Sequence, residues 1–279
     1  MVEDGLRAIL RRLRAGIRPE EVGLNPKPSG RPGPRVIGLS QPDMDFLTNR
    51  AVGTYHRFES GKISPRDEYL RRVGHILRMS EAEFTHVYLL ALGQRPPHPL
   101  SPDGGTVLAC AGAWQRAISG QREMAYVINV QWDLVAYNEQ FAELFTGGVP
   151  PENPLRWIAL SDEAREHTLT DWETRWAPRV LSQLRYARIQ YPGNRALAQL
   201  HQDVLRDRLA GPIYRHSAEL NPHSADDVRP LRHPTKGPGT VTVLASEPES
   251  TPGARHVVLL FDPQGEGATA VAGCGRAAR

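Results

Sequence analysis

The sequence predicts two domains, an all-α domain followed by an α+β domain. Residues 1–92 contain five short stretches with helical periodicity, and residues 93–104 form a linker rich in proline and glycine. Residues 105–265 contain strand-like alternation on both sides of a helical stretch. A length of 279 residues suits two domains. Residues 266–279 are predicted to be a flexible tail.

The all-α domain begins with residues 4–15, where leucines and an isoleucine recur at helical spacing after Asp4, the predicted cap. A loop at residues 25–38 follows, and its prolines and glycines exclude a helix. It carries three basic residues. Four further helices are predicted at 40–48, 51–60, 64–79 and 80–92. Ser80 and Glu83 have the spacing of a capping box at the start of the last one.

The α+β domain begins with two short strands within residues 125–138, around a Trp-Asp turn. Helices are predicted at 138–145, 153–160, 162–189 and 194–217. Three alternating strands are predicted at 228–234, 239–249 and 254–263. This order predicts a mixed sheet with helices packed on one face.

Charge and composition bound the function. Residues 1–97 hold 16 Arg/Lys against 11 Asp/Glu, whereas the remainder holds 18 against 20, so only the first part suits nucleic acid. No apolar run reaches the length of a membrane span, and the first residues lack a secretory signal. We therefore expect a cytoplasmic protein without membrane contact. Cys110 and Cys274 are too few for a disulfide framework and are expected to be free thiols.

A tight corner joins the predicted helices 40–48 and 51–60. Asn49 suits this corner because asparagine tolerates the left-handed backbone conformation. The residues predicted to face the core are Phe46, Leu47, Val52, Tyr55 and Phe58. A corner that presents the start of a helix is the helix-turn-helix arrangement that enters a DNA major groove. The predicted DNA-binding residues are Gln41, Arg50, Gly53, Thr54, His56, Arg57 and Lys62. The alternative is an ordinary five-helix bundle with a solvated face.

The stretch GLSQPDMDFLTNRAVGTYHRFESGK resembles the Xre-type helix-turn-helix. LRRLRAGIRPEEVGL, the basic loop, the Tyr55–Arg57–Glu59–Gly61 pattern and SEAEFTHVYLLAL resemble the DNA-binding half of MmyB-like transcription regulators. The blocks AYVINVQWDLVAYNEQFAELF, NPLRWIAL, TDWE, LRYARIQYP and LRHPTKGPGTVTV resemble, in order, the ligand-binding domain of that family, which is PAS-like. The resemblance covers residues 4 to about 263.

This resemblance implies a sequence-specific DNA-binding transcription regulator, with a helix-turn-helix domain followed by a PAS-like domain. Its expected partners are double-stranded DNA, a second copy of the chain and a hydrophobic small molecule such as a fatty acid, with no cofactor. The alternative is a regulator whose second domain recognises a partner protein. The sequence departs from the family at Asn49, Arg50 and Ala51, where glycine, an apolar residue and serine are usual. Gly53 within the recognition helix would cost about 0.5–1 kcal/mol relative to alanine.

All five tryptophans lie beyond the linker. Most are expected to pack in the core, but their density predicts an apolar cavity with an arginine at its mouth. The predicted ligand-binding residues are Trp132, Tyr137, Phe141, Trp157, Trp172, Arg185 and Arg156. Arg185 is preferred as the anchor because a guanidinium binds a carboxylate bidentately. The alternative for either arginine is a salt bridge with Asp171 or Glu173.

No enzyme motif stands out. The sequence has no Gly-x-Ser-x-Gly elbow, no Walker-type phosphate loop and no dinucleotide-binding glycine fingerprint. The ten histidines offer no ligand pair at helical spacing with a carboxylate partner. We therefore expect neither catalytic residues nor a metal site, although a single axial histidine of a haem sensor stays open.

Overall fold

A computed structural model of the chain describes residues 2–25, 38–101, 110–216, 228–248, 251 and 253–264. The chain divides into two compact units, Met1–Pro102 and Asp103–Arg279, and each is described by itself. Most of the predicted basic loop and all of the predicted tail lie outside the described residues. Within them, no helix combines the length and the apolar character that crossing a membrane requires.

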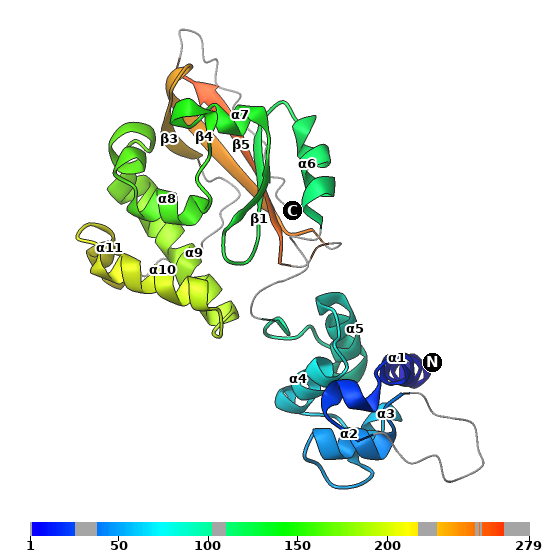
Figure 1. Cartoon of the computed structure of the whole chain (residues 1–279). Coiled ribbons are helices and arrows are strands. Elements are labelled where there is room, and N and C mark those ends of the chain that lie inside the picture. The colour runs from blue at the N-terminus through cyan, green and yellow to red at the C-terminus, as the bar shows by residue number, and fades with distance from the viewer. Residues whose placement is uncertain are drawn as a thin grey trace, which may run out of the picture. The chain divides into compact units, whose positions relative to one another are not determined.

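The N-terminal unit is all-α, as predicted (Figure 1). Its helices are α1 (Val2–Ala15), α2 (Gln41–Leu47), α3 (Thr54–Glu59), α4 (Asp67–Ile76) and α5 (Glu81–Leu92), with a 3₁₀ turn at Pro19–Val22. The capping box predicted at Ser80 and Glu83 is present. Leu10, Met44, Tyr55, Phe58 and Phe84 are fully buried and join four of the helices in one core.

Two residues of the predicted core are instead exposed. Phe46 is 73% exposed and Val52 is 87% exposed, whereas Tyr55 and Phe58 are buried as predicted. Phe46 lies on the side of α2 that faces away from the buried Met44 and Thr48. For Val52 the physical reason is the start of α3, which begins at Thr54 rather than near residue 51. Val52 therefore lies in the corner that precedes the helix, and its side chain does not follow the helix face that Tyr55 occupies.

Part of the predicted linker packs on the N-terminal unit. The side chain of Leu100 is 6% exposed and belongs to the helical core. The guanidinium of Arg71 donates hydrogen bonds to the backbone oxygens of His98 (2.6 Å) and Pro99 (2.7 Å). The backbone N–H of Leu100 donates to the Glu81 carboxylate (2.9 Å). Residues 98–101 are therefore fixed to α4 and α5.

The C-terminal unit is built on a five-stranded sheet in the order β2-β1-β5-β4-β3. Its strands are β1 (Met124–Ile128), β2 (Leu134–Tyr137), β3 (Val228–His233), β4 (Gly237–Ser246) and β5 (Arg255–Pro263). Every neighbouring pair is antiparallel, so the predicted mixed sheet is wrong. The central β5 pairs with β1 and β4, which brings the two ends of the domain's sequence together.

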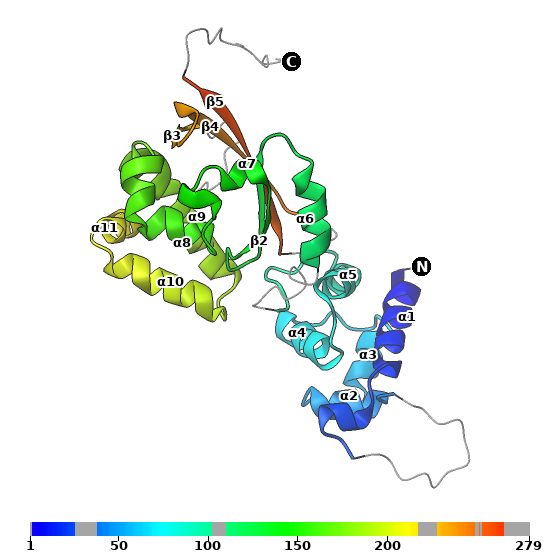
Figure 2. The same ribbon diagram turned by 45° about the horizontal axis from the view of Figure 1, so that its top comes forward.

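Helices cover both faces of this sheet, whereas the sequence predicted one covered face (Figures 1 and 2). One face of the sheet, called the large face here, shares a single core with five helices. These helices are α7 (Glu139–Ala142), α8 (Pro154–Leu160), α9 (Ala177–Gln190), α10 (Arg195–Arg206) and α11 (Ala210–His216). The other face packs against α6 (Ala111–Ser119), which the sequence did not predict. Ile118 of α6 joins Ala125, Val127 and Ala136 there, because these strand residues are also apolar.

The long helix predicted at 162–189 is broken. Two π-helical segments, Ala164–Thr168 and Trp172–Trp176, precede α9. Asp171 between them has φ 54, in the left-handed region. The predicted fold class, an all-α helix-turn-helix domain followed by an α+β PAS-like domain, is nevertheless confirmed, because these breaks leave the order of helices and strands unchanged.

Candidate ligand cavity and helix-turn-helix corner

An apolar cavity of about 330 Å³ lies between the large face of the sheet and the helices of the C-terminal unit. Its volume is near the lower end of the usual range for small-molecule sites, about 300–1,000 Å³. Aromatic and aliphatic side chains from the sheet and the helices dominate the lining, including Tyr126, Phe141, Phe145, Trp157, Leu231 and Leu259.

Aromatic rings support the cavity at one end. The Tyr126 and Phe141 rings stack with centroids 4.4 Å apart, and Phe145 contacts both Phe141 and Trp157 edge-on at 5.0 Å. These are favourable arrangements for aromatic pairs. Rigid rings in edge contact pack less completely than branched aliphatic side chains. The arrangement can therefore leave room for a flexible apolar ligand.

The cavity reaches the protein surface at β4. Leu244 lines it and is 45% exposed. The pairing of β3 with β4 extends only to Thr242, so within the described residues the end of β4 has β5 alone as its neighbour. Among the described residues, the cavity is therefore open to solvent on this side.

Two arginines are among the described residues that line the cavity. Arg229, on β3, is 3% exposed, and its guanidinium lies 4.9 Å from the Trp176 ring centroid. Arg255, at the start of β5, lies 4.8 Å from the Trp132 ring. Burial lowers the pKa of Arg255, which means that the site disfavours an uncompensated charge there. Both arginines are therefore positioned as cation–π partners of tryptophans in an apolar enclosure.

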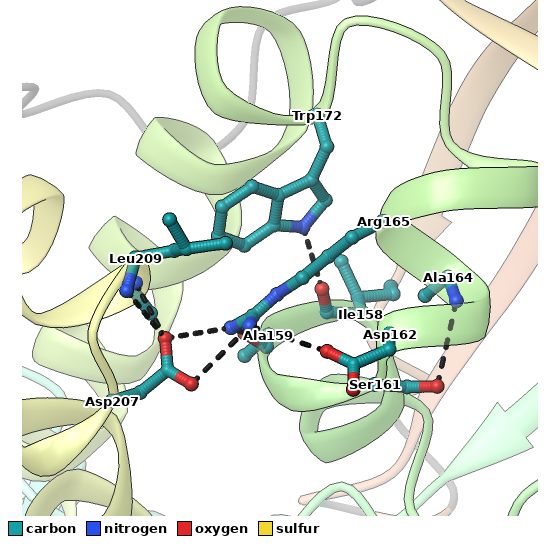
Figure 3. Close-up of polar contacts among 10 residues, drawn as sticks. Ile158, Ala159, Ser161, Asp162, Ala164, Arg165, Trp172, Asp207 and Leu209 are labelled. Carbon is teal, nitrogen blue, oxygen red and sulfur yellow. Dashed lines mark hydrogen bonds and ion pairs between the residues drawn. The ribbon is translucent and has the colours of Figure 1, made fainter.

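Arg165, a buried arginine of the first π-helical segment, lies over Trp172 of the second segment and pairs with Asp207 (Figure 3). Leu169, between the segments, and Trp176, in the second one, line the cavity. The side chain of Arg165 is 7% exposed and donates to both carboxylate oxygens of Asp207, at 3.2 and 2.9 Å. Its guanidinium also lies 4.5 Å from the Trp172 ring and bonds the backbone oxygen of Ala159. Burial alone would raise the pKa of Asp207, but Arg165 and two backbone N–H groups together hold it below its ordinary value.

In the N-terminal unit, one buried carboxylate fixes the corner between α2 and α3. Asp45 is 3% exposed, and it accepts hydrogen bonds from the backbone N–H groups of Gly53 and Tyr55, both at 2.7 Å. Asn49 (φ 54) and Gly53 (φ 85) supply the left-handed residues of the corner. Asp45 thus caps α3 from a distance in sequence, and Gly53 lies just before the helix rather than within it, so the expected cost of a helical glycine does not arise.

The start of α3 carries exposed polar and basic groups. Arg50, His56 and Arg57 are exposed, and Thr54 is half-buried with its hydroxyl donating to the Ala51 oxygen at 2.7 Å. Arg50 lies 5.7 Å from the ring of Tyr69, which orients its guanidinium. This face is therefore rich in donors and is supported by the buried Tyr55 and Phe58 behind it.

Residues 113–272 match the family model of the MmyB-like transcription regulator ligand binding domain. The chain belongs to the MmyB-like transcription regulators. The matched range includes every strand of the sheet and the whole described lining of the cavity. The C-terminal unit is thus the ligand-binding domain of a transcription regulator. No curated protein matches the chain.

The MmyB-like domain brings three of the predicted ligand-binding residues to the cavity, namely Trp132, Phe141 and Trp157. Tyr137 is on β2, 36% exposed, and is not among the lining residues. Trp172 lies beside the cavity wall, where its indole N–H donates to the Ile158 oxygen at 2.7 Å. Any role of these residues in ligand binding stays a prediction.

Both predicted anchor arginines lie away from the cavity lining. Arg156 bonds Asp203 at 2.7 Å on the surface of the MmyB-like domain. Arg185 donates to the backbone oxygen of Tyr214, and its guanidinium lies 4.9 Å from the Tyr214 ring. The cations on the described part of the lining are instead Arg229 and Arg255, which were not among the predicted ligand-binding residues.

The predicted DNA-binding residues are mostly accessible. Lys62 is exposed, as are the basic residues of α3 and its preceding corner. Gln41, predicted to reach a phosphate, instead donates to the buried carboxylate of Glu59, which also accepts from Arg14 at 3.2 Å. Its amide therefore helps to hold α2 against α3. Asp45 was missed because nothing local marks an aspartate as the cap of a helix that begins nine residues later.

Proposed function

We propose that this protein is a sequence-specific DNA-binding regulator whose C-terminal domain senses a hydrophobic small molecule such as a fatty acid. The observation that carries this proposal is the apolar, surface-connected cavity inside the MmyB-like domain. A domain that served only to recognise a partner protein would need no such cavity, so the cavity favours a small ligand over that alternative.

The DNA part of the proposal is supported by the helix-turn-helix corner. Asp45 fixes the corner, and α3 presents Arg57 and Thr54 on its outer side, with Arg50 before it. Arginine can bind a guanine edge with two hydrogen bonds, and threonine can contact a base or a methyl group. We propose that two copies of the chain bind an operator together, since paired half-sites are the common arrangement for this motif.

In the proposed mechanism, the ligand shifts a population. A ligand changes DNA affinity only to the extent that it binds one arrangement of the protein better than another. Cavity occupancy would then favour either the DNA-competent or the incompetent arrangement of the dimer. Native mass spectrometry of freshly purified protein tests for a retained ligand and for the dimer. A delipidated protein whose operator affinity is the same with and without long-chain acids would contradict the sensing role.

The DNA contact is tested by Arg57→Ala. We expect a loss of about 1–3 kcal/mol in specific binding if Arg57 contacts a base edge. Lys62→Ala should weaken specific and non-specific binding alike, through a phosphate. Arg72→Ala on α4, which removes the same charge from another exposed site, is the control. Gel-shift titrations on the protein's own promoter at two salt concentrations measure all three, and unchanged specific binding by folded Arg57→Ala refutes the contact.

A further inference from the structure

The corner between α2 and α3 carries an apolar side chain that the fold does not use. Val52 is 87% exposed, more than any other large apolar residue that the structure describes. Single apolar residues on a surface are ordinary, but turns are usually built from glycine, asparagine, aspartate, serine or proline, which suit turn backbones. Asn49 and Gly53 already supply the left-handed residues of this corner. The valine side chain is therefore available to a partner.

The backbone on both sides of Val52 is held in place. After it, the N–H of Gly53 donates to the buried Asp45 carboxylate at 2.7 Å. Before it, the Ala51 oxygen accepts from the N–H of Thr54 at 3.1 Å and from its hydroxyl at 2.7 Å. Branching at Cβ also restricts the valine to few χ1 rotamers. Val52 therefore presents its methyl groups in a narrow range of directions, and a partner that covers them orders little.

The surface around Val52 is basic. Arg50 and Arg57 are exposed, and the Nε group of Arg57 donates to the Gly53 oxygen at 3.4 Å, which brings that side chain beside the valine. No residue from 49 to 57 is acidic. The matching partner carries negative charge and a small apolar group. The major groove of DNA offers both, since phosphates border it and thymine presents a methyl group at its floor.

We propose that Val52 contacts the C5-methyl group of a thymine in the operator, beside the base that Arg57 contacts. Among the four standard bases, thymine is the one that presents a methyl group in the major groove, so covering this methyl favours an A·T pair over a G·C pair at that position. Such a contact needs no hydrogen bond, which suits a side chain without donors or acceptors. This inference rests on the proposed DNA-binding function and adds a specificity-determining residue to it.

The test removes the methyl group from the DNA. A binding site is selected from random duplexes with the full-length wild-type protein, and each of its thymines is then replaced singly by deoxyuridine, which pairs as thymine does but lacks the methyl. Dissociation constants are measured by fluorescence anisotropy. We expect a thymine at which deoxyuridine weakens wild-type binding about fourfold, as for a methyl-sized apolar group returned to water. Val52→Ala should bind the two forms of that site within about twofold of each other.

Two control variants keep the sensitivity to deoxyuridine if the proposal is right. Val52→Ile retains the branched apolar surface, and Leu89→Ala trims another exposed apolar residue of the same unit, on α5. If Val52→Ala responds to deoxyuridine at every thymine as the wild type does, the methyl contact is overturned while specific DNA binding stands. If Val52→Ala also binds the unmodified site with wild-type affinity, the valine belongs to a protein interface instead. A wild-type protein that selects no site refutes the proposed DNA-binding function itself.

Discussion

Asp45→Ala should destabilise the N-terminal unit and leave the C-terminal unit unchanged. The substitution removes both hydrogen bonds that the carboxylate accepts, from the N–H groups of Gly53 and Tyr55. The Tyr55 N–H is buried and would stay unpaired, at a cost of about 1–3 kcal/mol. Loss of the second bond, from the Gly53 N–H, adds about 0.5–1.5 kcal/mol. We therefore expect a loss of about 2–4 kcal/mol in the free energy of unfolding.

The two units can be observed separately in the full chain because all five tryptophans lie beyond residue 102. Tryptophan fluorescence reports on the C-terminal unit, whereas far-ultraviolet circular dichroism also reports on the N-terminal helices. For a domain of this size, about 1 kcal/mol lowers the Tm by roughly 4–8 °C. Asp45→Ala should therefore lower the helical transition by roughly 10 °C or more without moving the fluorescence transition.

Two further variants sharpen this test. Asp45→Asn keeps the shape but turns one acceptor into a donor that faces an N–H group, so it should also destabilise the unit. Glu20→Gln, at an exposed acidic site of the same unit, should change stability by less than about 0.5 kcal/mol. If Asp45→Ala unfolds at the wild-type temperature by circular dichroism, Asp45 does not fix the corner.

Three predictions concern the C-terminal unit, each measured by chemical denaturation followed by tryptophan fluorescence. Arg165→Met should cost about 1.5–3 kcal/mol because it removes a buried guanidinium that bonds the half-buried Asp207 carboxylate, whereas Arg156→Met should cost about 0–1 kcal/mol at its exposed pair; equal losses would contradict this difference. Because the folded-state pKa of Asp207 is lowered, its contribution is complete above the unfolded value, about 3.9, and is lost as pH falls through the folded value. The deficit of Asp207→Asn should therefore shrink in acid, and a deficit that stays constant would refute the ion pair. Gly239→Ala should destabilise, because a Cβ there would overlap β5, whereas Gly112→Ala on the open side of α6 should stabilise by about 0.5–1 kcal/mol; destabilisation by both would contradict the packing.

The sequence predicted elements best where the signal was local. The Ser80–Glu83 capping box and the three alternating strands after residue 227 are present in the structure. The helix α6 was missed because its apolar face is short, and its partner surface consists of small strand residues such as Ala125 and Ala136. That face of the sheet forms only when β1 and β2, from the start of the domain, pair with β5 from its end.

The number of aromatic residues in the C-terminal unit predicted a cavity. The arginines on its lining were not predicted, because Arg185 was preferred for its position in a block that resembles the family. A local signal did exist in the strands. Arg229 alternates with Leu231, and Arg255 alternates with Val257 and Leu259, so period two places both arginines on the core face. Arg185 lies on a helix, so alternation with period two does not tell which side its side chain faces. Its partner Tyr214 is distant in sequence.

Among the described residues of the C-terminal unit, the two non-glycine residues with a left-handed backbone lie at the cavity or beside its wall. Trp132, with φ 68, lines it, and Asp171, with φ 54, separates the π-helical segments that form its wall. A non-glycine residue in the left-handed region costs of order 1–3 kcal/mol and persists only where its surroundings hold it. Here the surroundings are Arg255 over Trp132 and Arg165 over Trp172.

A ligand that engages Arg255 would act directly on one of these supports, so we expect amide hydrogen exchange to change at residues 129–133 and 164–176 before it changes in the paired strands β4 and β5. Protection that rises uniformly over the whole unit on addition of a long-chain acid would instead indicate simple stabilisation, with no conformational signal leaving the cavity.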